Sequence, residues 1–203
     1  MIIVIDYAAG NTANVLRALA KLGVEADLSG DKEKILAADG LILPGVGAYP
    51  AAMAELEKRG LVNTIKSAVA QGTPLLGICL GMQLLTETGL EHEETVGLGF
   101  IPGVCRTIPM KAGYPVPHIG WSELKIKQES PLTVGLENQS VYFVHSYFTD
   151  VSADYIDVTA NYSMEVPAMI HKDRVYGVQF HPEKSGKVGL GILQKFVAFC
   201  GET

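Results

Sequence analysis

One cysteine of this chain stands in a setting that favours chemical reactivity. Cys79 lies in the segment Gly77-Ile78-Cys79-Leu80-Gly81, at the end of an apolar run. A cysteine that only packs as a small hydrophobe needs no flanking glycines. A nucleophile on a sharp turn from a strand into a helix does need them, and the start of the helix favours the reactive thiolate. The alternative is a core cysteine beside two packing glycines, and this segment alone leaves both interpretations open.

A base for such a nucleophile is present in the segment VQFHPEKS, residues 178–185. Pro182 keeps the residue before it extended, and residues two apart in an extended chain point the same way. His181 and Glu183 are therefore expected to face one side, where the carboxylate would orient the imidazole. With Cys79 they would form a nucleophile, base and orienting group. A His-x-Glu pair alone is more often a solvated strand end, but the presence of both this pair and the cysteine turn in one chain favours catalysis.

A third segment, LPGVGAYP at residues 43–50, offers backbone donors. Its glycines let N–H groups turn toward a ligand, as the stabilisation of an oxyanion requires. An ordinary turn between a strand and a helix is the alternative. The segment has neither the pattern of a P-loop nor that of a dinucleotide-binding loop.

The elements that would position these residues follow from the hydrophobic pattern. Apolar strands are expected at residues 1–6, 24–28, 40–44 and 73–78; helices are expected at 12–22, within 51–71 with an interruption at Gly60, and from about Leu80 to Thr88. This alternation predicts a parallel sheet covered by helices on both faces. After residue 95, short alternating segments predict antiparallel strands, and a last helix is expected at 189–199. We therefore expect an α/β fold with a mostly parallel central sheet, formed by a single domain, residues 1–203.

Composition excludes several classes of function. The chain has 203 residues and a net charge of −6 without a block of basic residues, which argues against a nucleic-acid partner. The start of the chain lacks the basic region of a signal peptide, and no run of 18 apolar residues predicts a membrane span. Three widely spaced cysteines indicate no disulfide framework. We therefore expect a cytoplasmic protein without a cofactor, in which Cys105 and Cys200 are structural.

A metal site is a further alternative that we do not predict. His145 could be a polar group beside the site, or it could join Cys79, His181 and Glu183 in binding zinc. These residues do not show the spacing of a His-Glu-x-x-His motif, which argues against a metal.

Seven segments together carry a family resemblance. In chain order they are IDYAAGN, LPGVGAYP, CLGMQLL, GLGFIPG, HIGW, YFVHSY and VQFHPEKSG. They resemble the class I glutamine amidotransferases of the triad type, whose fold is flavodoxin-like, and most of all the glutaminase subunits of imidazole glycerol phosphate synthase. Met82 stands where many other amidotransferases have histidine. The chain departs from the family pattern at Ser122, where asparagine is expected.

The resemblance implies a role for each matching residue. Cys79 would attack the amide carbon of glutamine, His181 would move the proton from the thiol to the leaving ammonia, and Glu183 would orient His181. Oxyanion donors would be backbone N–H groups near Val46, Gly47 and Leu80. Glutamine would be bound by Gly47, Gln83, Glu91 and the backbone of His145, Ser146 and Tyr147. The Glu91 carboxylate suits the α-ammonium group of the substrate, although a solvated loop acid is the alternative.

The resemblance also implies a partner. At neutral pH released ammonia becomes ammonium, which is no nucleophile, so it must pass directly to an acceptor. The implied partner is a cyclase subunit with a (β/α)8 barrel, joined in a heterodimer that acts in histidine biosynthesis. The interface candidates are Asn11, Asn14, Trp121, Tyr142 and Lys184.

Other functions remain open at this point. A glutaminase subunit could instead serve the synthesis of anthranilate, guanylate or pyridoxal phosphate. A stand-alone cysteine hydrolase of γ-glutamyl compounds would work at full rate without a partner. A non-catalytic binding module on the same fold would keep its function after Cys79 is alkylated.

Overall fold

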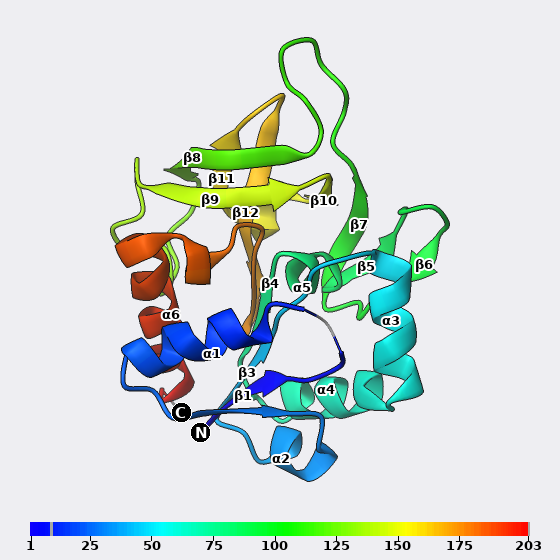
Figure 1. Ribbon diagram of the computed structural model, residues 1–203, viewed down its shortest axis with the longest axis vertical. Helices are drawn as coiled ribbons and strands as arrows, with labels where there is room; N and C mark the ends of the chain where they lie inside the picture. The colour runs from blue at the N-terminus through cyan, green and yellow to red at the C-terminus, as the bar shows by residue number, and fades with distance from the viewer. Residues whose placement is uncertain (9, 203) are drawn as a thin grey trace.

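The first 83 residues alternate between strands and helices, as the sequence predicts (Figure 1). The computed structural model describes residues 1–8 and 10–202. Gly60, at a φ of 66°, separates two helices at the predicted position. In chain order the elements are β1 (Ile2–Ile5), α1 (Thr12–Lys21), β2 (Ala26–Ser29), α2 (Lys32–Leu36), β3 (Gly40–Leu43), α3 (Tyr49–Lys58), α4 (Leu61–Ala70), β4 (Leu75–Ile78) and α5 (Leu80–Gln83).

Strands dominate the remainder of the chain until a final helix. They are β5 (Thr86–Gly89), β6 (Thr95–Val96), β7 (Ile101–Thr107), β8 (His118–Ile126), β9 (Ser140–His145), β10 (Tyr147–Val151), β11 (Ile156–Asn161), β12 (Glu165–Lys172) and β13 (Val175–Val178). Two short 3₁₀ turns, Ala153–Tyr155 and Pro182–Lys184, precede β11 and the last helix, α6 (Gly186–Cys200). This helix begins three residues before the predicted start.

The main sheet joins a parallel half to an antiparallel half. Within the described residues its strand order is β2-β1-β3-β4-β13-β12-β11-β8-β9. The first five strands are parallel, and each later neighbour is antiparallel. The predicted fold class is therefore confirmed. The sequence pattern did not show that β13, from the C-terminal half, pairs in parallel with β4.

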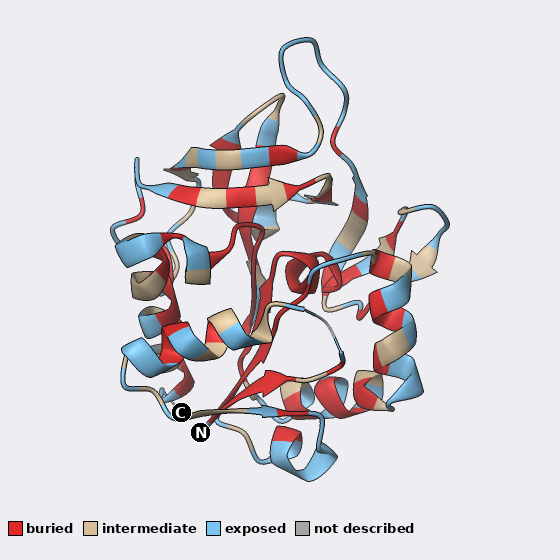
Figure 2. Ribbon diagram, viewed as in Figure 1, coloured by how far each residue is buried: buried red, intermediate tan, exposed pale blue. Residues whose placement is uncertain are grey.

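Helices cover both faces of the parallel half. Along β1, Ile2 and Val4 pack with residues of α1 and α6, whereas Ile3 and Ile5 pack with residues of α2, α3 and α4. This is the period of two that a strand buried on both faces requires. Figure 2 shows the buried strands between helices whose outer surfaces are exposed. Burying each large aliphatic side chain contributes about 1.5–3 kcal/mol to the hydrophobic term.

The predicted helix from Leu80 to Thr88 is wrong beyond its first turn. α5 ends at Gln83, and the following residues form β5, which pairs with β7 in a smaller sheet of order β10-β7-β5-β6 in the described part of the chain. The hydroxyl of Thr86 donates to the carbonyl oxygen of Gln83 at 2.8 Å. This hydroxyl takes a carbonyl that a continuing helix would use, and threonines at 86 and 88 favour a strand.

Within residues 1–8 and 10–202, no helix is both long enough and apolar enough to cross a bilayer.

Candidate active site

Cys79 occupies the turn that joins β4 to α5. Its backbone has φ 54° and ψ −108°, a conformation that is costly for a residue with a side chain. A Cβ on Gly77 would lie 2.5 Å from the carbonyl oxygen of Gly81, and one on Gly81 would overlap the carbonyl of Leu43. Both glycines are therefore required by close backbone packing, as the sequence predicts for a nucleophile turn.

Strand pairing brings the cysteine and the histidine to one edge of the sheet. β4 and β13 run in parallel with Gly77 opposite Gly177, and the N–H of Cys79 donates to the carbonyl of Val178 at 2.8 Å. Parallel strands end at the same edge. The residues that follow β13 therefore lie beside the cysteine turn, and His181 is among them.

His181 and Glu183 form a buried pair. Nδ1 of His181 lies 2.7 Å from Oε1 of Glu183, and both side chains are almost fully buried. Burial alone lowers the pKa of His181, but the Cys79 thiol and the Glu183 carboxylate outweigh it and raise this pKa to about 9. The other ring nitrogen, Nε2, has no hydrogen-bond partner among the described residues. Nδ1 donates to the carboxylate, so Nε2 is the nitrogen that exchanges a proton with the Cys79 sulfur, and the raised pKa favours holding that proton on the ring at pH 7.

A line of polar side chains leads from α1 to Glu183. Arg17 donates to Oδ1 of Asn14 at 2.7 Å, Asn14 donates to Oδ1 of Asn11 at 2.5 Å, and Asn11 donates to Oε1 of Glu183. Glu183 Oε1 therefore accepts from both Asn11 and His181. This arrangement fixes the carboxylate, and through it the ring.

Cys79 and His181 open onto one cavity of about 280 Å³. A cavity of this size suits a small ligand, because drug-sized ligands take about 300–1,000 Å³. The residues predicted from the sequence to form the oxyanion hole and to bind substrate all line it. Its lining is Val46, Gly47, Cys79, Leu80, Gln83, Glu91, Val144, His145, Ser146, Tyr147, His181 and Lys184.

The loop between β3 and α3 forms one wall of this cavity. Gly47 has a φ of 110°, in the region that favours glycine. The hydroxyl of the buried Tyr7 donates to the carbonyl of Pro44 at 2.7 Å and anchors the loop. Burial, with a smaller effect of Cys79, raises the pKa of Tyr7, so the hydroxyl remains a donor. A Cβ on Gly45 would overlap this hydroxyl.

Hydrogen bonds fix the side chains of Glu91 and His145 in the cavity wall. Oε2 of Glu91 accepts from the N–H of Tyr49 at 2.8 Å, which fixes the carboxylate. His145 lies 2.7 Å from the carbonyl of Tyr147 through Nδ1 and 3.0 Å from Nδ1 of His118 through Nε2. Burial lowers the pKa of His145 to about 4, so this ring is neutral at pH 7.

The predicted interface residues lie around the segment of residues 181–185. Asn11 contacts Glu183, and Tyr142 exchanges backbone hydrogen bonds with this segment, donating to Ser185 Oγ and accepting from the N–H of His181, each at 3.0 Å. Trp121 is 58% exposed on β8, and its ring lies 6.1 Å from that of Tyr142. Four of the five candidates therefore connect to the histidine and carboxylate directly or through one another, and the fifth, Lys184, lines the cavity itself.

Ser122 also has a defined place. Its hydroxyl lies 2.9 Å from Nε2 of His118, so it caps the pair of His118 and His145. Three residues that contact the site were missed by sequence reasoning: Tyr7, Val144, whose carbonyl accepts weakly from the Cys79 thiol at 3.8 Å, and Gln179. Gln179 stands two residues before His181, and the period of two along a strand could have placed it on the same side.

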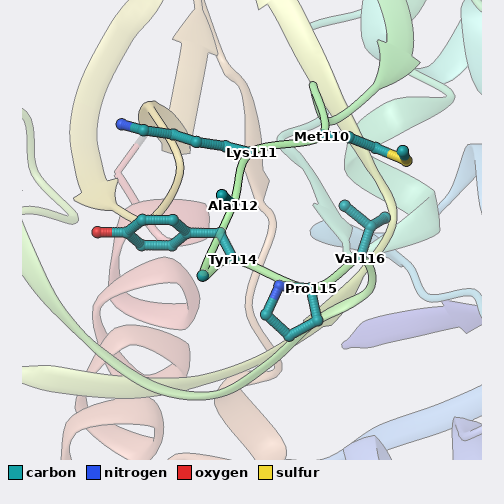
Figure 3. A pocket seen from close by; sticks show the side chains of 7 residues that line it. Met110, Lys111, Ala112, Tyr114, Pro115 and Val116 are labelled. Atoms are coloured by element: carbon teal, nitrogen blue, oxygen red, sulfur yellow. The ribbon is translucent and has the colours of Figure 1, made fainter.

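Other features of the described residues lack this chemistry. A hollow of about 650 Å³ lies against the loop between β7 and β8 and is lined by residues 110–116, which include no cysteine, histidine or carboxylate (Figure 3). Among residues 1–8 and 10–202, no group of three His, Cys, Asp or Glu side chains is placed to hold a metal ion. Cys105 and Cys200 are buried, and burial raises the pKa of both thiols, that of Cys200 to about 12.

Comparisons with known proteins identify the family of this chain. Residues 3–198 match the family model "Glutamine amidotransferase class-I", and the chain belongs to this family. Relatives at high identity carry a more particular name. A protein of Streptococcus mutans, 75% identical over 98% of this chain and all of its own length, is "Imidazole glycerol phosphate synthase subunit HisH". A Listeria monocytogenes protein of the same name is 52% identical over 97% of this chain and 94% of its own.

Solved structures share the fold at low sequence identity. A crystal structure of a glutamine amidotransferase has a TM-score of 0.79 at 19% identity and covers 99% of this chain and all of that one. The PurLQS structure from Thermotoga maritima has a TM-score of 0.74 at 22% identity, covering 98% and 97%.

Proposed function

We propose that this chain is the glutaminase subunit of imidazole glycerol phosphate synthase and that it hydrolyses L-glutamine to glutamate and ammonia for a cyclase subunit. The observation that carries the proposal is the set of Cys79, His181 and Glu183 at one edge of the sheet, with the first two on a cavity sized for a small ligand. The relatives named "Imidazole glycerol phosphate synthase subunit HisH", matched over 94% or more of their own length, support the assignment to this particular synthase.

The first half of the reaction forms a thioester. Nε2 of His181 takes the proton of the Cys79 thiol, and Sγ attacks the side-chain amide carbon of glutamine. The negative charge that develops on the amide oxygen meets backbone N–H groups of Val46, Gly47 and Leu80. When the C–N bond breaks, His181 returns the proton to the nitrogen, which leaves as ammonia. The second half mirrors the first, because His181 takes a proton from water, which attacks the thioester and releases glutamate and the thiol.

Substrate selection uses the remaining cavity residues. The Glu91 carboxylate, held by the N–H of Tyr49, binds the α-ammonium group of glutamine. Gln83, Gly47 and the backbone from His145 to Tyr147 bind the rest of the substrate. A neutral His145 places no positive charge beside the imidazolium of His181.

The partner is a cyclase subunit that accepts ammonia directly. The two subunits form a heterodimer, and the partner is a (β/α)8 barrel. The proposed interface consists of Asn11, Asn14, Trp121, Tyr142 and Lys184. Asn11 and Tyr142 contact residues 181–185 and Lys184 lines the cavity, so docking on these residues would act on the base and its carboxylate. We therefore expect slow glutamine hydrolysis by the chain alone and stimulation of kcat by orders of magnitude in the complex.

The test separates making ammonia from using it. In the complex, Cys79→Ala should abolish product formation from glutamine. The variant complex should still form product from added ammonium salt. The rescued rate should rise with pH at fixed total ammonium, because neutral ammonia is the nucleophile. His181→Ala is the control that removes the base by another route and should behave alike. Failure of ammonium to rescue either variant, while the subunits remain associated, would contradict the proposal.

A further inference from the structure

Two buried glutamine side chains lie between the cavity wall and the nucleophile. Gln179 is fully buried and Gln83 is 5% exposed. Nε2 of Gln83 lies 3.2 Å from the carbonyl of Tyr147 and 3.2 Å from Oε1 of Gln179. Nε2 of Gln179 lies 3.7 Å from Sγ of Cys79. A buried amide without partners is costly, and here every partner of the Gln179 side chain belongs to the site.

The direction of these hydrogen bonds follows from one fixed acceptor. The carbonyl oxygen of Tyr147 has no hydrogen to donate, so the amide of Gln83 must turn its NH₂ group toward it. The same NH₂ group faces Gln179, which must therefore present its oxygen to Gln83. The only group that Gln179 can then turn toward the sulfur is its own NH₂. His145 reinforces the anchor, because its Nδ1 also lies 2.7 Å from the Tyr147 carbonyl.

We propose that Gln179 is a further catalytic residue, whose side-chain amide donates a hydrogen bond to Sγ of Cys79 and stabilises the thiolate before it attacks. A donor directed at the sulfur favours the charged form over the thiol. The bond also fixes the position of the sulfur, since Gln179 is itself held by Gln83. This inference deepens the proposed function, on which it rests for the identity of the substrate.

The other role that Gln179 could have is packing, and the structure distinguishes the two. A side chain that only filled space would be served as well by a methionine or leucine, which carry no polar group to satisfy. Replacing Gln179 by methionine keeps the length and removes the donor. Replacing it by glutamate keeps the length and the acceptor for Gln83, but an ionised carboxylate repels a thiolate.

The test measures how fast iodoacetamide alkylates Cys79 at pH values from 5 to 10, with mass spectrometry to locate the label. The full chain is used as wild type, Gln179→Met, Gln179→Glu and the control Gln194→Met, which alters an exposed residue of α6. Thermal unfolding of each variant reports whether it folds. The probe needs neither glutamine nor the partner. The result therefore tests the role of Gln179 even if glutamine proves not to be the substrate.

We expect Gln179→Met to slow the labelling of Cys79 at pH 7 by about tenfold, because the donor that favours the thiolate is lost. Gln179→Glu should slow it further, and Gln194→Met should leave it unchanged. In the complex, kcat for glutamine should fall in the same order. A wild-type alkylation profile in folded Gln179→Met overturns the inference; where that variant does not fold, a wild-type profile in Gln179→Glu overturns it.

Discussion

Within the described residues, two histidines each pair with a buried carboxylate, and one of the two pairs lies beside a thiol. His181 lies 2.7 Å from Glu183 at the end of β13, and His171 lies 2.6 Å from Asp157 between β12 and β11. In both pairs Nδ1 faces the carboxylate, and in both the pKa of the ring is raised. The surroundings differ. His181 is buried beside Cys79, whereas the ring of His171 is partly exposed and stacks on Tyr176 at 5.0 Å.

This comparison shows that a histidine–carboxylate pair does not by itself make a catalytic site. The carboxylate sets which nitrogen of the ring carries a proton, and it does so in both places. The remaining nitrogen decides the role: that of His181 is next to a nucleophile, and the ring of His171 links two strands near the protein surface. We therefore expect the first pair to serve chemistry and the second to serve stability.

Removing each ring is the strongest way to separate the two roles. In the complex, His181→Asn should lower kcat for glutamine hydrolysis by at least about 10³-fold, because it removes the base. His171→Asn should change it less than about twofold. Steady-state assays of both variants check this expectation. An equal loss of activity in the two variants would show that the pairs are not functionally distinct.

Changing each carboxylate to its amide should give a smaller contrast in activity. Glu183→Gln should lower kcat by about 10²-fold, since His181 loses the group that orients it and favours its imidazolium. Asp157→Asn should leave kcat unchanged and lower the free energy of unfolding by about 1–3 kcal/mol, because Asp157 is buried. Activity assays and urea unfolding, applied to both variants, provide the measurements; a loss of activity in Asp157→Asn would contradict this division.

The smallest expected effect is a pH dependence of stability. The folded pKa of His171 is raised, first through its hydrogen bond with Asp157. The added stability is therefore fully present below the unfolded pKa of about 6.5 and is lost as pH rises through the folded value. We compare the free energy of unfolding of wild type with that of His171→Gln. The advantage of wild type should be about 1 kcal/mol larger at pH 6 than at pH 9. Urea unfolding at both pH values checks this, and a difference that grows with pH would refute it.

The parts of the site that sequence reasoning predicted are local. Backbone constraints within a few residues explain three predicted features: the glycines around Cys79, the extended geometry around Pro182 and the glycines of residues 45–47. The same is true of Gly60, which separates α3 from α4. Local geometry also explains the one wrong helix, because the hydroxyl of Thr86 ends α5 through a side-chain hydrogen bond that apolar periodicity does not show.

The parts that were missed depend on pairings between distant residues. β13, the parallel neighbour of β4, comes from the other half of the chain. The hydrophobic pattern of β13 predicted a strand but did not indicate that it pairs with β4. The amides of Gln83 and Gln179 meet only because of this pairing. Asp157 and His171 meet across neighbouring strands whose register contains irregularities. Such contacts require the sheet order, which hydrophobic periodicity does not contain.

The insertion of β13 beside β4 has a consequence for the newly synthesised chain. β4 takes β3 as one neighbour as soon as both have left the ribosome, but its other neighbour lies near Gln179, which follows Cys79 by 100 residues. At about 5–20 residues per second, translation of that interval takes ~5–20 s. Under the proposed function, the nascent chain releases no ammonia during this time, because Cys79 does not yet have His181 beside it. The apolar edge of β4 is also open to pairing with other chains, which makes this interval the one in which aggregation competes with folding.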